Sequence, residues 1–489
     1  MIKPHRNRAL VSFFFIIAIG TIPSRSLANV REFFAPTKPL TAFLNSIGMC
    51  THLERSNWQP YRKWLRMMKA AGVHTIRNDI AWSAVEKKRG VFRFPPRIAG
   101  WIHAAEGMGI QPIVVLDYGN PIYPNQGIGS AASPKTTFPE YLRYVRFVVT
   151  HLKGIVHWYE IWNEPNGFTF NTQYGGDWRG GGWVKPYCRL ANETAALIHQ
   201  LDPKAQVLTG GMEAVIAQQC LPYWKNRYDY IAIHPYCMPF LPEYEDGPIS
   251  ALRQEMKRTH FQAGLLATEQ GWCTGQGVIP PWGYHGEITP RDQAKFLLRT
   301  LFYNFFDGLR LTCWYDFLCN GSDPNNWEDN FGIVNANGTP RPAYTALLNL
   351  TRALGKQQNI PAANRFSKPL NVTGILPSQN QLEGVFLQAA PHRFLLCLWE
   401  YTPTPDRFTT TGPDTSRPFR HNDWDRTLTL QLPLIQLGVP TVKQMDPMAG
   451  PQWHPAKATP NGMYVQVSGL RVNDHPTVIE LDFPPHPYH

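Results

Sequence analysis

WYEIWNEPN at residues 158–166 and LLATEQGW at residues 265–272 are the two stretches that decide the fold of this chain. Each begins as an apolar run with strand character and ends in a polar, aromatic loop. A glutamate, Glu164 or Glu269, lies where the strand gives way to the loop. The end of an inward-facing barrel strand presents side chains in this way. The two stretches therefore predict two strands of one barrel whose carboxylates meet at the same rim.

Strands and helices alternate on both sides of these stretches. Segment 61–71 has the periodicity of an amphipathic helix, and Thr289-Pro290 begins another helix with a cap residue and a proline at its first position. Besides the strands that carry Glu164 and Glu269, the expected strands lie near 48–52, 74–82, 111–118, 206–210, 228–236 and 309–316. Eight strand–helix units predict an α/β fold, the closed (β/α)8 TIM barrel.

The pattern changes near residue 355. Short alternating strands, separated by Pro, Gly, Asn and Asp turns, follow at 394–399, 427–432, 464–467 and 478–483. They predict a C-terminal antiparallel β-sandwich. We therefore expect a signal peptide at 1–28, the barrel at 29–355 and the sandwich at 356–489. An independent carbohydrate-binding module is the alternative for the last region, although no planar aromatic stripe supports it.

The first 28 residues have the pattern of a secretory signal. Three basic residues precede the apolar stretch 9–22, and Ser26-Leu27-Ala28 is a small-residue cleavage site. The expected location is secreted or periplasmic. The apolar stretch is short for a membrane span, and no later segment has the length of a transmembrane helix, so no stable span is expected after cleavage. An uncleaved anchor is the alternative.

Charge and motifs limit the partners. The formal net charge of +11 favours an anionic polysaccharide or an anionic envelope surface, or serves solubility alone. No basic run with interleaved aromatics occurs, so no nucleic-acid partner is expected. The chain has no Gly-rich phosphate motif, and we expect no cofactor and no metal. A monomer is expected.

The eight cysteines are an even number, as in exported proteins with disulfides. Their spacing gives no CxxC pair and no cluster with a nearby His, which excludes a structural zinc site of the usual pattern. The pairs Cys237–Cys273 and Cys188–Cys220 are the predicted disulfides. Buried thiols are the competing interpretation.

Two facing carboxylates suit cleavage of a glycosidic bond. One protonates the leaving oxygen, and the other attacks the anomeric carbon or activates water for that attack. At the two glutamates and their neighbours, over about residues 40 to 355, the sequence resembles the clan A glycoside hydrolases and most closely glycoside hydrolase family 39. These are retaining barrel enzymes. The resemblance implies that Glu164, in Asn-Glu-Pro, is the acid/base and that Glu269 is the nucleophile, with carboxyl groups about 5 to 5.5 Å apart.

The resemblance also implies supporting roles. Asn163 is expected to bind the 2-hydroxyl of the sugar, and Arg77 to hold the nucleophile ionised. His234 and Tyr236 are expected to orient the nucleophile, and Trp314 to lie under the sugar. A rim salt bridge, a core histidine and a core tryptophan are the structural alternatives.

Further candidates lie on the same rim. His52 and Asp117 are weaker candidates for contacts with sugar hydroxyls. Trp272 is a candidate for substrate binding, and further aromatics follow strands four and seven: Phe168, Phe170, Tyr174, Trp178, Trp183, Trp282 and Tyr284. Aromatics along an open cleft suit a polymer. The same side chains could instead pack together and close a pocket.

Three functions follow from these expectations. The first is a retaining β-glycoside hydrolase that is endo-acting on a β-linked polysaccharide, such as a bacterial exopolysaccharide or a plant cell-wall glycan. The second is an exo-acting, β-xylosidase-like enzyme. The third is an inactive carbohydrate-binding protein on the same scaffold, against which the presence of both Glu164 and Glu269 argues.

Overall fold

The fold is described from a computed structural model of the chain. The structure describes residues 30–33, 37–123, 138–167, 170, 181–237, 241–274, 288–355, 370–373, 381–401, 408–409, 412–413, 426–432 and 437–485. The signal segment 1–28 lies outside these residues, as do Phe168, Tyr174, Trp178, Trp282 and Tyr284. Within them, no helix is both long and apolar enough to cross a membrane.

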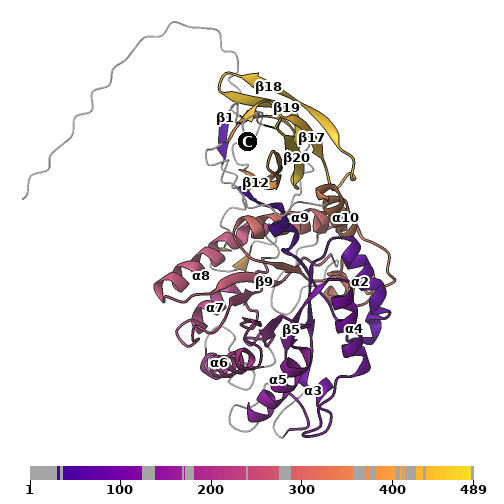
Figure 1. The fold of residues 1–489 in the computed structure, drawn as a ribbon, viewed down its shortest axis with the longest axis vertical. Coiled ribbons are helices and arrows are strands. Elements are labelled where there is room, and N and C mark those ends of the chain that lie inside the picture. Colours follow the sequence, from indigo (N-terminus) through magenta and orange to yellow (C-terminus); the bar gives the residue numbers. More distant parts are fainter. Residues whose placement is uncertain are drawn as a thin grey trace, which may run out of the picture.

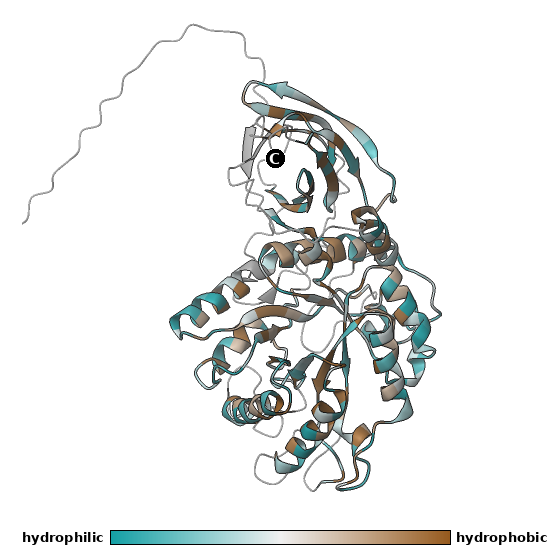
Figure 2. Ribbon diagram, viewed as in Figure 1, coloured by the Kyte–Doolittle hydropathy of each residue, from teal (hydrophilic) through white to brown (hydrophobic). Residues whose placement is uncertain are grey.

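Eight parallel strands form a closed barrel, as the sequence predicts. They are β3 (Ile47–Cys50), β4 (Thr75–Asp79), β5 (Gln111–Leu116), β6 (Trp158–Ile161), β7 (Gln206–Leu208), β8 (Tyr230–Ile233), β9 (Gly264–Gln270) and β10 (Thr312–Trp314). Strand β10 pairs with β3 and closes the circle. The strands are mostly hydrophobic because both of their faces are covered (Figure 2).

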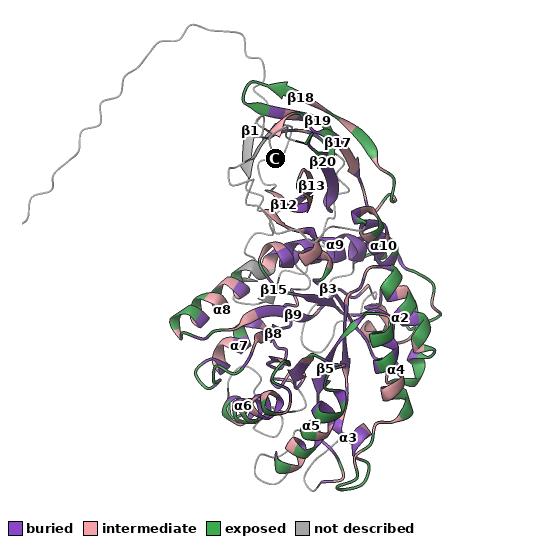
Figure 3. Ribbon diagram, viewed as in Figure 1, coloured by how far each residue is buried: buried purple, intermediate pink, exposed green. Residues whose placement is uncertain are grey.

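Helices surround the barrel (Figure 1). They are α1 (Leu40–Leu44), α2 (Tyr61–Ala70), α3 (Trp82–Val85), α4 (Pro96–Gly107), α5 (Phe138–Leu152), α6 (Val184–Leu201), α7 (Ala214–Cys220), α8 (Asp246–Arg258), α9 (Pro290–Phe306) and α10 (Pro342–Leu354), with short 3-10 turns η1 (Ser56–Trp58), η3 (Pro242–Glu245) and η4 (Trp327–Asn330). Helix α9 begins at a capping box of Thr289 and Asp292 with a proline at its start, as predicted. The outer helices bury one face and expose the other (Figure 3).

A cluster of buried apolar side chains fills the inside of the barrel. They are Cys50, Ile113, Leu208, Ala232, Leu266, Leu311 and Cys313. Because side chains alternate between the faces of a strand, the sequence neighbours of these residues point outward into the layer between strands and helices. This alternation decides which side chains at the carboxyl end of each strand face the opening of the barrel.

The second domain is an antiparallel β-sandwich. A sheet in the order β1-β11-β16-β19-β18-β17-β20-β13-β12-β2 wraps around its own apolar core. Its strands are β1 (Val30–Phe33), β2 (Thr37–Pro39), β11 (Leu370–Thr373), β12 (Gln381–Ala390), β13 (Arg393–Tyr401), β16 (Arg426–Leu432), β17 (Thr441–Met445), β18 (His454–Asn461), β19 (Tyr464–Val472) and β20 (Thr477–Asp482); β14 (Phe408–Thr409) and β15 (Gly412–Pro413) pair separately. The first two strands belong here, not to the barrel, so the expected boundary at residue 29 is wrong.

Helix α9 joins the two domains and is buried along nearly its whole length (Figure 3). Arg299 of α9 pairs with Glu243 of η3, and Glu243 also accepts a hydrogen bond of 2.9 Å from the indole of Trp399 in the sandwich. Lys295 of α9 pairs at 2.8 Å with Asp474. The ion pair of Lys295 with Asp474 and the hydrogen bond from Trp399 to Glu243 cross the junction, and they fix the sandwich against the barrel.

The predicted disulfides do not form. None of the eight cysteines, all of which lie in the described part of the chain, is in a disulfide. The sulfur of Cys237 contacts the carbonyl of Leu241 at 3.4 Å, while that of Cys273 contacts the carbonyl of Trp327 at 3.2 Å. In the second pair, the sulfur of Cys188 faces the backbone carbonyl of Cys220 at 3.8 Å. The thiols thus pack as small apolar side chains with weak backbone contacts.

The charges at the junction allow a stability test. Glu243→Gln leaves the buried guanidinium of Arg299 without its counter-charge, and we expect the free energy of unfolding to fall by about 3–5 kcal/mol. Urea denaturation measures this loss. Glu255→Gln is the control, because Glu255 pairs with Arg258 on the exposed surface of α8 and such pairs contribute little. Equal effects of the two substitutions would contradict the assignment.

Candidate active site

Glu164 and Glu269 lie together at the carboxyl end of the barrel. One oxygen of each carboxylate and one ring nitrogen of His234 all lie within 4.8 Å of one another. This closeness is compatible with the carboxyl separation of about 5 to 5.5 Å in retaining glycosidases. The two side chains differ in exposure, since that of Glu164 is 41% exposed and that of Glu269 is 13% exposed.

The backbone turns sharply at the end of β6 to present Glu164. Both Trp162, with φ 76°, and Glu164, with φ 42°, adopt left-handed conformations that cost energy for residues other than glycine. The amide of Glu164 donates to the carbonyl of Gly211 at 3.1 Å, and the carbonyl of Glu164 accepts from Gly167 at 2.8 Å. These bonds hold the strained turn. Glu269, by contrast, belongs to β9 itself.

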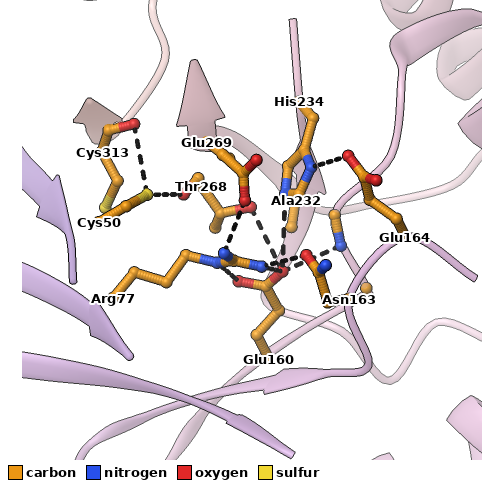
Figure 4. Close-up of polar contacts among 12 residues, drawn as sticks. Cys50, Arg77, Glu160, Asn163, Glu164, Ala232, His234, Thr268, Glu269 and Cys313 are labelled. Carbon is orange, nitrogen blue, oxygen red and sulfur yellow. Dashed lines mark hydrogen bonds and ion pairs between the residues drawn. The ribbon is translucent and has the colours of Figure 1, made fainter. Parts of the chain in front are cut away.

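Arg77 is the centre of the polar contacts at the site (Figure 4). Its Nε and Nη2 atoms donate to the two oxygens of Glu160 at 2.8 and 2.9 Å. Its Nη1 donates to Glu269 at 2.9 Å, and its Nη2 also donates to the amide oxygen of Asn163 at 2.7 Å. The planar guanidinium fits such a forked arrangement, so one buried cation sets the positions of three side chains.

Glu160 is a further member of this group and was not predicted from the sequence. It lies two residues after Trp158 on β6, is fully buried, and also accepts hydrogen bonds from the amide of Gly211 and the hydroxyl of Thr268. A charged residue inside an otherwise apolar strand was the available signal. Such a residue needs a buried partner of opposite charge, which Arg77 supplies.

Asn163 is held on both sides of its amide group. Its oxygen accepts from Arg77, and its nitrogen donates to the hydroxyl of Tyr118 at 2.9 Å. The amide is therefore fixed next to the two glutamates.

His234 and Tyr236 contact different glutamates. The hydroxyl of Tyr236 donates to Glu269 at 2.8 Å, whereas Nδ1 of His234 lies 2.9 Å from Glu164. The expectation that both residues orient Glu269 is wrong for His234. Both residues end β8 on the same face, but the histidine ring lies over Gly211 and is directed toward the neighbouring turn.

Burial controls the charge of these groups. It raises the pKa of Glu164, and Arg77 opposes that rise only in part. Burial and the charge of Glu164 also raise the pKa of Glu269, while Arg77 and the hydroxyl of Tyr236 oppose the rise. Only Glu269 touches the guanidinium directly, so we infer that Glu269 is the first of the pair to ionise and that Glu164 keeps its proton.

The histidine supports this assignment. Burial lowers the pKa of His234, which favours the neutral ring. With its hydrogen on Nε2, the ring accepts the proton of Glu164 at Nδ1 and directs Nε2 toward Glu160, 4.0 Å away. A neutral acceptor beside Glu164 favours the protonated carboxyl group.

Trp314 and Trp272 do not reach the site. Cys313 of β10 fills the barrel interior, so Trp314 points outward, is fully buried, and stacks on Trp272 at 5.5 Å between centroids. Trp272 in turn packs against Phe296 of α9. Both tryptophans are core residues, and the expectation that they bind substrate is wrong. Tyr315, the next residue, is directed toward the interior of the barrel instead.

The other described loop aromatics are also packed inward. Phe170 and Trp183 are fully buried and both contact Tyr187 of α6. No stacking platform for a sugar follows from these two residues.

His52 and Asp117 follow β3 and β5 and are both buried, at 8% and 0% exposure. No described residue forms a hydrogen bond with either nitrogen of the His52 ring or either carboxylate oxygen of Asp117. Burial raises the pKa of Asp117 well above its usual range and raises that of the nearby Glu54 to about 7. The polar atoms of His52 and Asp117 that were expected to contact sugar hydroxyls are therefore buried in this structure.

Two further glutamates surround the pair. Glu213, which precedes α7, accepts from Asn166 at 2.9 Å, and the charge of Glu164 raises its pKa in addition to burial. Glu328 of η4 accepts from the hydroxyl of Tyr315 at 2.9 Å. Neither glutamate was predicted from the sequence, because loop residues separate each of them from the preceding barrel strand.

Comparisons with known proteins support the fold. No protein-family model matches the chain, and no curated protein sequence matches it. Three solved structures are similar: a family 39 glycoside hydrolase from the gut symbiont Bacteroides cellulosilyticus WH2, a glucosidase from Croceicoccus marinus and an α-L-arabinofuranosidase from Thermotoga maritima.

The first of these has 19% sequence identity and a TM-score of 0.61, over 91% of this chain and 82% of that chain. The glucosidase has 12% identity and a TM-score of 0.53, over 86% and 91%. The arabinofuranosidase has 11% identity and a TM-score of 0.52, over 89% and 96%. The expected likeness to family 39 is thus confirmed at the level of the fold.

Gly211 offers a test of how tightly the site is packed. A Cβ atom at this position would lie 2.0 Å from Nε2 of His234, so Gly211→Ala must displace the ring that contacts Glu164. We expect the free energy of unfolding to fall by about 1–3 kcal/mol in chemical denaturation.

Gly247→Ala is the matched control, because nothing lies near the added methyl group in α8 and alanine favours a helix. It is expected to be neutral or stabilising. If Gly211→Ala is as stable as Gly247→Ala, the described contact of Gly211 with His234 is incorrect.

Proposed function

We propose that this protein is a retaining β-glycoside hydrolase, with Glu164 as acid/base and Glu269 as nucleophile. One observation carries the proposal: Arg77 and Tyr236 bind Glu269 directly, while Glu164 contacts a histidine whose neutral form is favoured. Two adjacent carboxyl groups in different environments ionise at different pH values. That difference is what an acid and a nucleophile in one site require.

The reaction follows from this division. Glu164 gives its proton to the leaving oxygen as the glycosidic bond breaks, and a carboxylate oxygen of Glu269 forms a bond to the anomeric carbon. Glu164, now ionised, takes a proton from a water molecule that attacks the same carbon and releases Glu269. Two displacements give net retention of configuration. Arg77 and Tyr236 stabilise Glu269 when it leaves as an anion.

The proposed substrate is a β-linked polysaccharide, such as a bacterial exopolysaccharide or a plant cell-wall glycan, that is cut internally by a secreted or periplasmic enzyme. The exposure of Glu164 supports a polymeric substrate, since a leaving group of any length can reach an open acid/base. Product lengths from defined polysaccharides, read by mass spectrometry, test it. Mixed oligosaccharides support internal cutting, and release of single sugars alone would instead identify an exo-acting, β-xylosidase-like enzyme.

Replacing each glutamate should give a different defect. Glu269→Gln removes the nucleophile, so activity should fall by several powers of ten on every substrate. Glu164→Ala removes the proton donor, so substrates with poor leaving groups should suffer most, while activated aryl glycosides still react with Glu269. Added azide should then restore turnover and give a β-glycosyl azide.

Glu193→Gln, on the exposed face of α6, is the control and should keep full activity. A β-glycosyl azide from the Glu269 variant, or an azide of inverted configuration from the Glu164 variant, would exchange the two roles. Full activity in both variants, or no hydrolysis by the wild-type protein on any glycan, would reject the proposed enzyme, and the latter result would favour a carbohydrate-binding protein.

Tyr236→Phe should change the pH dependence. The hydroxyl of Tyr236 donates to Glu269 and lowers its pKa. Without it the pKa of Glu269 rises, so the nucleophile loses its charge at a higher pH, and the acidic limb of the kcat/KM profile should move to higher pH. The basic limb, which reports Glu164, should move much less.

Tyr123→Phe is the matched control, because the hydroxyl of Tyr123 donates to Glu86 instead. Its profile should equal that of the wild type. An acidic limb that does not move in Tyr236→Phe would show that this limb does not report Glu269.

A further inference from the structure

A second cluster of polar side chains lies beside the catalytic candidates. His52 follows β3, Glu54 lies in the next turn, and Asp79 ends β4. One ring nitrogen of His52 and one carboxylate oxygen each of Glu54 and Asp79 lie within 4.8 Å of one another. Because β3 and β4 are neighbours in the barrel, their ends bring these three groups together.

The imidazole of His52 is fixed but unsatisfied. Its ring packs edge to face against Trp58 at 5.6 Å and Tyr315 at 5.9 Å. The residue is 8% exposed, and no described residue bonds to either ring nitrogen. A buried polar group without a partner is costly, so this nitrogen is suited to a ligand that enters the cluster.

The two carboxylates are positioned from outside the cluster. Asn78 donates to one oxygen of Glu54 at 2.8 Å, and the Nε atom of Arg55 lies 3.4 Å from the other. The amide of Asn78 is itself fixed by the hydroxyl of Thr51 at 2.8 Å. No described residue donates a hydrogen bond to the carboxylate of Asp79.

A further carboxyl group lies in the neighbourhood. Asp117, at the end of the next strand β5, is fully buried, and its two carboxylate oxygens have no described donor. The guanidinium of Arg55 pairs with Glu54, and that of Arg77 bonds to Glu160, Glu269 and Asn163. The local set of acceptors therefore exceeds the local donors.

We propose that His52, Glu54 and Asp79 bind a divalent first-row metal ion such as Mn²⁺ or Zn²⁺. One imidazole and two carboxylates form a mixed nitrogen and oxygen set, which suits these ions, whereas Mg²⁺ and Ca²⁺ prefer oxygen alone. A sugar cannot reach the buried ring nitrogens, but a bare ion is small enough to lie between the three groups. Asn78 acts as an outer partner that orients Glu54.

The other cluster of possible ligands, formed by Glu164, His234 and Glu269, is less suited to a metal. Its groups already have protein partners, since Arg77 and Tyr236 bond to Glu269, and His234 bonds to Glu164. The two clusters can therefore be separated by substitution.

Metal binding to the full chain tests the proposal. After treatment with EDTA and its removal, the protein is titrated with MnCl₂ and with ZnCl₂ in isothermal calorimetry. We expect one site, whose affinity falls at least about tenfold in Asp79→Asn and in Glu54→Gln, as is usual for metal-site residues. The double variant Glu164→Gln/Glu269→Gln should bind the metal as the wild type does.

Pulsed electron paramagnetic resonance of the Mn²⁺-loaded wild type adds a test that needs no variant. Nitrogen hyperfine coupling from the imidazole is expected, and it should disappear in His52→Gln, whose folding is checked by thermal melting without metal. Absence of binding by both ions, bound Mn²⁺ without nitrogen coupling, or loss of binding only in the Glu164/Glu269 double variant would overturn the proposal.

Discussion

The buried guanidinium of Arg77 is the interaction on which the rest of the site depends. It neutralises Glu160 inside the barrel, holds Asn163, and binds Glu269 at 2.9 Å. A buried carboxylate without such a partner would be protonated. Arg77 lies on β4, Glu160 on β6 and Glu269 on β9, so the closed barrel is what brings them together. We infer that this one cation decides which of the two catalytic candidates ionises first.

Buried ion pairs also hold the two domains together. Helix α9 follows the strand that carries Glu269 and is buried between barrel and sandwich. Its Arg299 and Lys295 pair with Glu243 and Asp474, so the helix cannot shift without exposing or unpairing charges. We infer that the sandwich stabilises the side of the barrel behind the nucleophile, which gives it a structural role.

Sequence alone predicted the eight strands and the proximity of Glu164 to Glu269, because apolar runs ending in polar loops are local signals. It did not predict Glu160, whose importance depends on a contact with a residue two strands away. Trp314 was misplaced because β10 is short, and a one-residue change of register exchanges the faces of a strand. The prediction of disulfides was wrong because an even number of cysteines carries no information about the distances between their sulfur atoms.

The central claim is that Glu269 forms the covalent intermediate. The most direct measurement is to incubate the protein with a panel of 2-deoxy-2-fluoro-β-glycosides bearing good leaving groups, which slow the breakdown of a glycosyl-enzyme, and to locate the bound sugar by peptide mass mapping. We expect one sugar per chain, attached to the peptide that contains Glu269. Attachment to Glu164, or turnover of a matching substrate without any labelled peptide, would contradict it.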